Sequence, residues 1–205
     1  MKIKMILLFI LFRVFAHGQV DSTDIIIGKM MKEQKIAGLT LAVVKNGKTV
    51  VNKGYGLANV ELNVPRNPPE TVIRIGSMSK QFFTAAILKL MEEGKLSIDD
   101  YVHKFFPDAP ETWRPIQVKH LMSHSSGLKR EGPAYNNSVI QPDLVIIKSA
   151  YPLPLDFKTG EKYQYCNLAY FMLAEIITQV SGMPWQDYIR EKTLYSRRNE
   201  EQLHD

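Results

Sequence analysis

The hydroxyl of Ser77 stands three residues before the amine of Lys80, at the start of an apolar-periodic run over residues 81–93. Positions i and i+3 share one face of a helix, so Lys80 can reach back toward Ser77. A serine nucleophile needs a neighbouring group of this kind to accept its proton. A helix start also supplies unpaired backbone N–H groups and a partial positive charge, which favour an oxyanion. The spacing therefore predicts nucleophilic serine chemistry at Ser77.

A second Ser-x-x-Lys pattern, Ser126 with Lys129, provides an internal control. Gly127 follows this serine directly, and Gly132-Pro133 comes soon after. No amphipathic run is present to hold serine and lysine on one helical face. We therefore predict a loop or turn at Ser126 and not a second nucleophile.

Tyr165 and Asn167 stand two residues apart, directly before a predicted helix. In an extended segment residues i and i+2 point the same way, so both side chains can face one site. A tyrosine beside a lysine ammonium loses its proton more easily and can act as base or acid. The amide of Asn167 can accept from Lys80 and donate to a substrate carbonyl. The alternative is a buried tyrosine followed by an asparagine that caps the helix.

Other reactive side chains form weaker patterns. His120 and His124 stand at i and i+4, but no glutamate lies between them and no third metal ligand is evident. We expect these histidines to pack or form hydrogen bonds, and we expect no metal site. Cys166 is the single cysteine, so no internal disulfide can form. The sequence contains no phosphate loop, dinucleotide fingerprint or Gly-x-Ser-x-Gly elbow, so we expect no cofactor.

A β-hairpin is predicted ahead of this chemistry. The Asn-Gly pair at residues 46–47 separates two β-rich runs, residues 39–44 and 49–53, and such a pair is a strong hairpin signal. An amphipathic helix is expected before the hairpin, over residues 21–35, and a proline-rich loop after it, around residues 65–69.

Helices are predicted for the remainder of the chain. The run after Ser77 carries one apolar stripe, residues 95–155 read as short helices and loops, and a second strong helix covers residues 167–180. A short helix over residues 185–192 follows. A hairpin followed by helices indicates an α+β fold. The stripe of the first helix contains Phe83, Ala86, Ile87, Leu90 and Met91.

The first residues resemble a targeting segment. Lysines precede an apolar run from Met5 to Ala16, and a small-x-small cleavage pattern follows at residues 16–18. We predict that residues 1–18 are a secretory signal and that the mature chain starts at Gln19; the alternative is an uncleaved anchor. The run is too short to span a bilayer comfortably. The expected location is therefore periplasmic or secreted, without stable membrane insertion after cleavage.

Composition favours an ordinary globular domain, because 45% of the 205 residues are hydrophobic and 23% are charged. The net charge is 26 − 21 = +5, and three of the 26 basic residues lie in the predicted signal, which leaves 23 − 21 = +2. We therefore expect no nucleic-acid partner and a small-molecule or peptide substrate. The sequence predicts no particular oligomeric state.

Several ordered motifs resemble one known family. Residues 72–81 and residues 163–167 are similar to the first two signatures of the serine β-lactamase and penicillin-binding-protein superfamily. The closer resemblance is to the class C β-lactamase-like and esterase branch, whose second motif is Tyr-x-Asn. Residues 38–56 resemble the opening hairpin of that branch, and residues 119–128 resemble a segment between its two motifs. The resemblance implies a β-lactamase/transpeptidase-like fold, with an antiparallel sheet packed against a helical region.

The resemblance also implies residue roles. Ser77 would attack a carbonyl and become acylated, Lys80 and Tyr165 would relay protons, and Asn167 would hold the substrate amide or ester. The backbone N–H of Ser77 would supply half of an oxyanion hole. The substrates implied are β-lactams, D-amino-acid peptides and small esters. A class A mechanism is not supported, because the second motif here is not Ser-Asp-Asn.

The third family motif, a Lys- or His-x-Gly triplet on a later strand, has no match after Asn167. Residues 158–160 read Lys-Thr-Gly but precede Tyr165, so we interpret them as a turn. The resemblance therefore implies a partial domain over residues 19–195 that lacks the C-terminal strands, followed by an irregular polar tail over residues 196–205. Two functions remain open: an exported serine hydrolase, or a truncated, catalytically dead fragment or binding module of the same fold.

Overall fold

The computed structural model describes residues 22–194. They divide after Arg74 into two compact units, here called the hairpin unit (residues 22–74) and the helical unit (residues 75–194). The predicted signal, residues 1–18, and the predicted tail, residues 196–205, lie outside the described residues. Within residues 22–194, no helix combines the length and apolar character that a membrane crossing requires.

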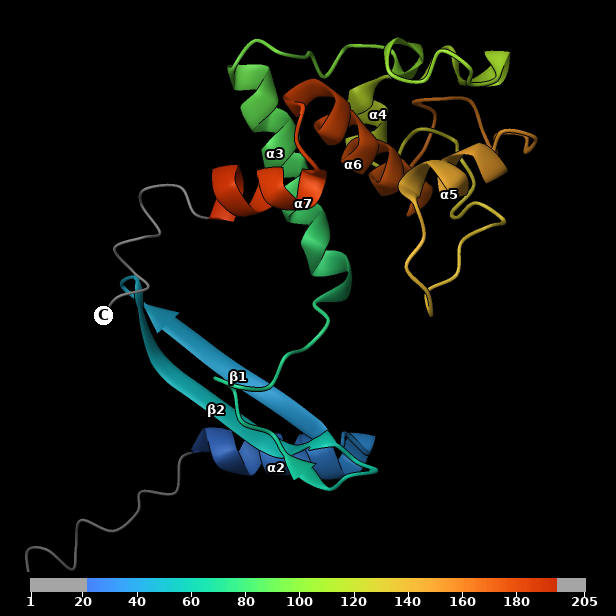
Figure 1. The fold of residues 1–205 in the computed structure, drawn as a ribbon. Coiled ribbons are helices and arrows are strands. Elements are labelled where there is room, and N and C mark those ends of the chain that lie inside the picture. The colour runs from blue at the N-terminus through green and yellow to red at the C-terminus, as the bar shows by residue number, and fades with distance from the viewer. Residues whose placement is uncertain (1–21, 195–205) are drawn as a thin grey trace, which may run out of the picture. The chain divides into compact units, whose positions relative to one another are not determined.

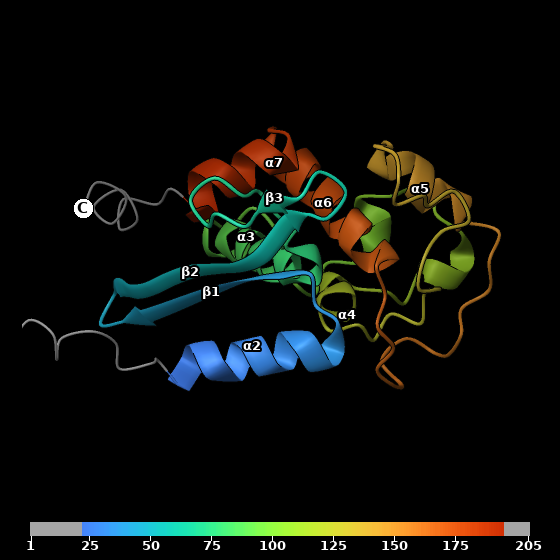
Figure 2. The same cartoon turned by 90° about the horizontal axis from the view of Figure 1, so that it is seen from below.

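The hairpin unit contains helix α2 (Ser22–Gln34) and a three-stranded antiparallel sheet in the order β1-β2-β3. Figures 1 and 2 show α2 lying along the β1–β2 hairpin. Both residues of the predicted turn are left-handed, Asn46 at φ 54° and Gly47 at φ 76°, as a type I′ hairpin requires. Lys53 and Tyr55 both bond to Asp24, at 3.1 and 2.6 Å, and so tie β2 to α2. The strands are β1 (Gly38–Lys45), β2 (Lys48–Asn59) and β3 (Val64–Pro65).

The predicted helix and hairpin are confirmed, but the second strand runs six residues beyond its predicted end at Lys53, to Asn59. Two glycines break the β-rich pattern there, and β1 pairs with β2 only as far as Gly56. From Leu57 onward β2 pairs instead with β3, which lies where a proline-rich loop was expected. Pro65 fits this position because an edge strand pairs with a neighbour on one side only, so a residue there can lack a backbone N–H without losing a hydrogen bond of the sheet.

The helical unit contains both predicted strong helices, α3 (Lys80–Glu92) and α6 (Leu168–Ser181). A 3₁₀ turn, η1 (Gly76–Ser79), leads into α3, and Gly182 at φ 72° ends α6. The short helices predicted between and after them are also present. These are η2 (Val102–Lys104), η3 (Glu111–Trp113), α4 (Val118–Met122), α5 (Asp143–Ser149), α7 (Trp185–Tyr188) and the π-helical turn η4 (Ile189–Leu194).

Helix α6 forms the centre of the helical unit and contacts α3, α4, α5 and α7 (Figure 1). It is apolar on most sides, as a helix surrounded by other helices must be. The predicted stripe of α3 faces this core: Ala86, Ile87 and Leu90 are fully buried, and Phe83 and Met91 are half-buried. A close-packed core of this kind is a rigid base for side chains at the helix ends.

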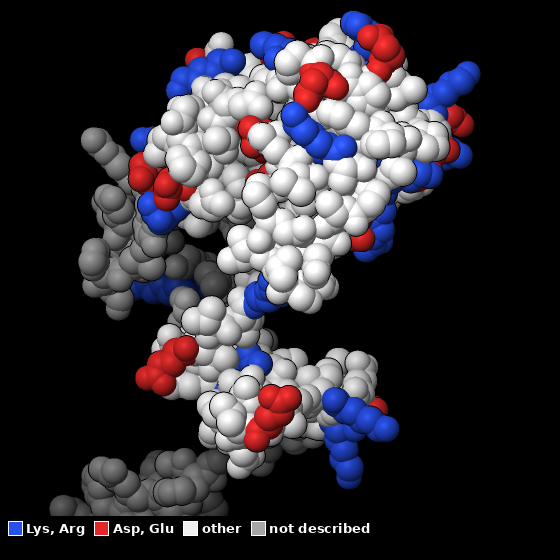
Figure 3. Space-filling model, turned by 45° about the vertical axis from the view of Figure 1, so that its right-hand side comes forward, with Lys and Arg blue, Asp and Glu red and all other residues white. Residues whose placement is uncertain are grey.

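The observed mixture of an antiparallel sheet and helices confirms the predicted α+β class. Among residues 22–194, all three named strands precede Ser77. Basic and acidic side chains are interspersed over the visible face of the helical unit (Figure 3).

Candidate active site

Ser77 lies in η1, and its side chain is exposed. Its Oγ is 2.5 Å from the hydroxyl of Tyr165 and 3.4 Å from Nζ of Lys80, the first residue of α3. The 3₁₀ turn and α3 run on without interruption, so the i, i+3 spacing puts serine and lysine on one face. The structure thus brings Ser77, Lys80 and Tyr165 together, and the fourth predicted residue, Asn167, joins them through Lys80.

Lys80 occupies the middle of the group. Its ammonium donates to Oδ1 of Asn167 at 2.9 Å and lies 4.9 Å from the ring centroid of Tyr165 and 5.1 Å from that of Tyr170. Aromatic faces attract a cation at such distances. The ammonium is therefore held between two rings and an amide, within reach of the Ser77 hydroxyl.

Asn167 stands at the N-cap position of α6, yet its side chain does not cap the helix. The carbonyl of Arg130 accepts the backbone N–H groups of Asn167 and Leu168, at 2.8 and 3.1 Å, so a loop supports the helix start. The freed amide bonds to Lys80 and, through Nδ2, to Oε1 of Glu131 at 2.9 Å. Sequence reasoning missed Glu131, because no periodic pattern marks its loop.

His124 supports the segment that carries Tyr165. Its Nδ1 accepts the N–H of Cys166 at 3.1 Å, and its ring lies 4.6 Å from the ring of Tyr165 and 5.2 Å from that of Tyr170. Burial lowers the pKa of His124, and the positive charge of Lys80 lowers it further. A neutral imidazole can accept the Cys166 N–H, whereas an imidazolium cannot.

His120 lies in a different environment from His124. Its Nδ1 accepts the N–H of Gln117 at 3.1 Å, in a capping box at the start of α4. Both histidines thus form hydrogen bonds, as predicted. Within residues 22–194, no group of three or more His, Cys, Asp or Glu side chains is placed to hold a metal ion.

The surroundings of the Tyr165 phenol lower its pKa. Burial opposes its ionisation, but bonds to Lys80 and Ser77 and the charges of Lys80 and Arg130 outweigh this, so the pKa of Tyr165 lies below its ordinary value. The guanidinium carbon of Arg130 is 5.2 Å from the tyrosine ring centroid. A phenol with a lowered pKa in contact with a serine hydroxyl can accept its proton and return it later.

The second Ser-x-x-Lys pattern and the Lys-Thr-Gly triplet both lie in loops or turns, as predicted. Ser126 is non-helical and only 1% exposed, and Lys129 pairs with Asp156. The Lys-Thr-Gly triplet forms a turn in which Gly160 has φ 82° and donates to the carbonyl of Ser125 at 2.8 Å. Neither arrangement brings a lysine to an exposed serine.

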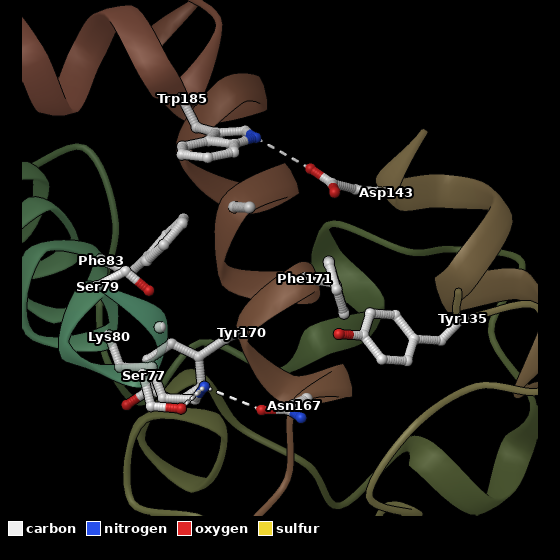
Figure 4. Close-up of a pocket in the computed structure, with 12 residues that line it drawn as sticks. Ser77, Ser79, Lys80, Phe83, Tyr135, Asp143, Asn167, Tyr170, Phe171 and Trp185 are labelled. Carbon is white, nitrogen blue, oxygen red and sulfur yellow. Dashed lines mark hydrogen bonds between the residues drawn. The ribbon is translucent and has the colours of Figure 1, made fainter. Parts of the chain in front are cut away.

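A cavity of about 360 Å³ opens beside the Ser77 group. Figure 4 shows Ser77, Lys80 and Asn167 at one end of it and Asp143 with Trp185 at the other. Sequence reasoning selected neither Asp143 nor Trp185, because nothing in the sequence joins residues on α5 and α7 to the Ser77 motif.

Residues 24–201 match the family described as Beta-lactamase. The chain is 30% identical to Protein flp of Staphylococcus aureus (strain COL) over 177 residues, covering 83% of this chain and 35% of that protein. Because the chain spans well under half of such relatives, their whole activity does not transfer to it directly.

Solved structures have the same fold. The octameric penicillin-binding protein homologue from Pyrococcus abyssi is 33% identical, with a TM-score of 0.69 over 86% of this chain and 42% of that one. The beta-lactamase/D-alanine carboxypeptidase from Yersinia pestis is 26% identical, with a TM-score of 0.66 over 80% of this chain and 49% of that one. The described residues therefore have the β-lactamase/transpeptidase-like fold, as predicted.

Proposed function

We propose that this chain, which belongs to the Beta-lactamase family, is a serine hydrolase that cleaves amide or ester bonds through a covalent acyl-enzyme at Ser77. One observation carries the proposal: the exposed Ser77 hydroxyl lies 2.5 Å from the Tyr165 phenol and 3.4 Å from the Lys80 ammonium. A nucleophile, a proton acceptor and a fixed cation are then in mutual contact, as nucleophilic catalysis requires.

In the acylation step, Ser77 Oγ attacks the substrate carbonyl while its proton passes to Tyr165. The tetrahedral oxyanion forms near the first turn of the helix, where the backbone N–H of Ser77 can donate to it. Collapse breaks the bond to the amine or alcohol, which leaves with the proton from Tyr165. Ser77 is then an ester, and Tyr165 has returned to the state that accepts a proton.

Deacylation repeats these transfers with water. Tyr165 accepts a proton from the attacking water, and Ser77 recovers its proton as the carboxylic acid departs. The ammonium of Lys80 lies beside the phenol and favours the phenolate. Asn167 has a second amide hydrogen besides the one given to Glu131, and it can donate this hydrogen to the substrate carbonyl.

The substrate classes follow from this chemistry. An acyl-enzyme can form from a β-lactam, a D-amino-acid peptide or a small ester, and each offers a carbonyl with a leaving group. The name of the relative from Yersinia pestis, a beta-lactamase/D-alanine carboxypeptidase, supports the first two classes.

The decisive experiment is active-site labelling. Purified protein is incubated with a fluorophosphonate and, separately, with a fluorescent penicillin, and its intact mass is measured. We expect one adduct on the wild-type chain and none on Ser77→Ala. The matched control is Ser126→Ala in the second Ser-x-x-Lys pattern, which should still be labelled. Because Ser77 is exposed, its substitution should leave the circular dichroism spectrum unchanged.

A folded wild-type chain that forms no adduct with either probe would contradict the hydrolase and support the catalytically dead binding module. An adduct that persists in Ser77→Ala would place the nucleophile elsewhere.

Export is part of the same proposal. We infer cleavage after Gly18 from the lysines, the apolar run and the small-x-small pattern of residues 1–18. Expression in a secreting bacterial host, followed by N-terminal sequencing, tests it. A mature protein that starts at Gln19 is expected, and a cytoplasmic product that retains Met1 would contradict export.

A further inference from the structure

The cavity beside Ser77 has two chemically different ends. Lys80 and Asn167 line the end at the nucleophile, and Asp143 lines the far end (Figure 4). Its volume of about 360 Å³ lies within the roughly 300–1,000 Å³ common for small-molecule sites. A ligand that spans this cavity meets a cation at one end and a carboxylate at the other.

Aromatic rings form the walls between these ends. The rings of Phe83 and Trp185 lie 4.8 Å apart on one side, and those of Tyr135 and Phe171 lie 5.6 Å apart on the other. Ala174 of α6 also lines the cavity, and its small side chain leaves room there. Such walls cover an apolar segment of a ligand, and their ring faces attract a cation.

Asp143 is the first residue of α5, and its Oδ2 accepts the indole N–H of Trp185 at 3.0 Å. Within residues 22–194, no ion pair neutralises this carboxylate. Burial raises the pKa of Asp143, and the charge of Glu175 on α6 raises it further, although the bond from Trp185 acts in the opposite direction. A partly buried carboxylate without a neighbouring cation costs free energy, and a ligand cation paired with it would lower that cost.

We propose that this cavity binds an apolar segment ending in an ammonium group, with the ammonium paired to Asp143 beside the ring of Trp185. Combined with the proposed function, on which this step rests, the substrates are esters or amides that carry a basic amino group. An apolar spacer separates that amino group from the carbonyl attacked by Ser77. The carbonyl lies at the Lys80 end and the ammonium at the Asp143 end.

A binding measurement tests the cavity without any catalysis. The Ser77→Ala chain is titrated calorimetrically with 4-phenylbutylamine and with its neutral counterpart 4-phenylbutan-1-ol. We expect the amine to bind about tenfold more tightly, the size of difference that one ion pair with cation–π contact can produce. Asp143→Asn should remove this preference, while Asp143→Glu should retain part of it.

Two controls separate charge recognition from structural damage. Asparagine at position 143 can still accept the Trp185 N–H, so alcohol binding by Asp143→Asn should be unchanged and reports a folded cavity. Asp187→Asn removes a carboxylate on α7 that pairs with Arg190 at 2.8 Å outside the cavity, and should leave the amine preference intact. Equal affinity for amine and alcohol, or a preference that survives Asp143→Asn, would overturn the inference.

Hydrolysis by the wild-type chain then tests the substrate class. We expect faster release of p-nitrophenol from p-nitrophenyl 6-aminohexanoate than from p-nitrophenyl heptanoate, and a reversed order in Asp143→Asn. If the amine binds through Asp143 but neither ester is hydrolysed, the cavity inference stands and the proposed hydrolase alone fails.

Discussion

The helical unit and the hairpin unit differ in how much apolar surface each buries. In the helical unit both faces of α6 are covered, and Leu173 is fully buried. In residues 22–74 only Ile27 among the hydrophobic side chains is buried, while Ile25 and Val44 are 60% and 64% exposed. A short sheet gains little stability without further covered surface. The unit with the packed core also carries every residue of the candidate site.

This coincidence has a physical reason. Ser77, Lys80, Tyr165 and Asn167 come from two segments far apart in sequence, and their contacts need positions held to fractions of an ångström. The pair α3 and α6 supplies that rigidity because each buries an apolar face against the other. We therefore expect damage to the helical unit to disable the site, and damage to the hairpin unit to leave it intact.

The largest expected effect separates two lysines. Lys80→Met should lower the rate of Ser77 labelling by about 100- to 10,000-fold, because without the ammonium the pKa of Tyr165 rises and the phenol no longer accepts the serine proton. Lys53→Met removes a comparable ammonium from the hairpin unit, where it pairs with Asp24 at 3.1 Å, and should leave the rate unchanged. Labelling kinetics followed by intact mass measure both. Equal losses of labelling rate in the two variants would contradict this expectation and show that the hairpin unit supports the site.

The next effect concerns stability. Leu173→Ala should cost about 2–5 kcal/mol, because it leaves a cavity in a packed core. Val44→Ala, at a largely exposed strand position, should change the free energy of unfolding by less than about 0.5 kcal/mol. Urea denaturation followed by circular dichroism gives both values. Tryptophan fluorescence isolates the helical unit, because Trp113 and Trp185 both lie there. Similar costs for the two variants would refute the contrast.

A smaller, pH-dependent effect concerns His124. Its folded-state pKa lies below 6.5 because of burial and then the charge of Lys80, so below about pH 6.5 the unfolded chain binds more protons than the folded chain. The contribution of neutral His124 to the free energy of unfolding is therefore complete above that pH, and it declines as the pH falls through the folded-state pKa of His124. We expect the urea midpoint and the Ser77 labelling rate to fall together in this range.

The matched variants for this titration are His124→Asn and His120→Asn. Asparagine tolerates the left-handed backbone of residue 124, at φ 58°, and can accept the Cys166 N–H in place of Nδ1. His124→Asn should therefore flatten the acid limb of the profile of labelling rate against pH. His120→Asn should keep that limb, because His120 bonds to Gln117 outside the site. An unchanged limb in His124→Asn would exclude this residue as its source.

Two glycine-to-alanine substitutions have the smallest expected effects, and they should change the stability of the two units in opposite directions. Gly182→Ala should destabilise the helical unit by about 1–2 kcal/mol, because φ is 72° there and a left-handed backbone strains any Cβ. Gly28→Ala, inside α2 with open space around it, should stabilise the hairpin unit by about 0.5–1 kcal/mol. Thermal denaturation followed by circular dichroism gives the sign of each change, and a stabilising Gly182→Ala would contradict the assigned backbone.

Local signals in the sequence predicted most of the elements. The Asn-Gly turn identified the hairpin, the apolar stripe identified α3, and the i, i+3 spacing linked Ser77 to Lys80. Each of these rests on interactions between near neighbours, which a short window contains. The extension of β2 and the strand β3 were missed because their pairing joins residues without a β-rich pattern, such as Leu57 with Pro65.

Local propensity was enough to place a serine, a lysine and a tyrosine of suitable type near helix starts, because helix ends and motif spacing depend on near neighbours. The packed fold brings Tyr165 into contact with Ser77 across 88 positions of chain, which no local pattern predicts. It alone turned the Asn167 amide from a cap toward Lys80 and Glu131, and placed Asp143 at the end of the same cavity. These contacts depend on how helices pack in three dimensions, and no pattern along a single segment records that packing.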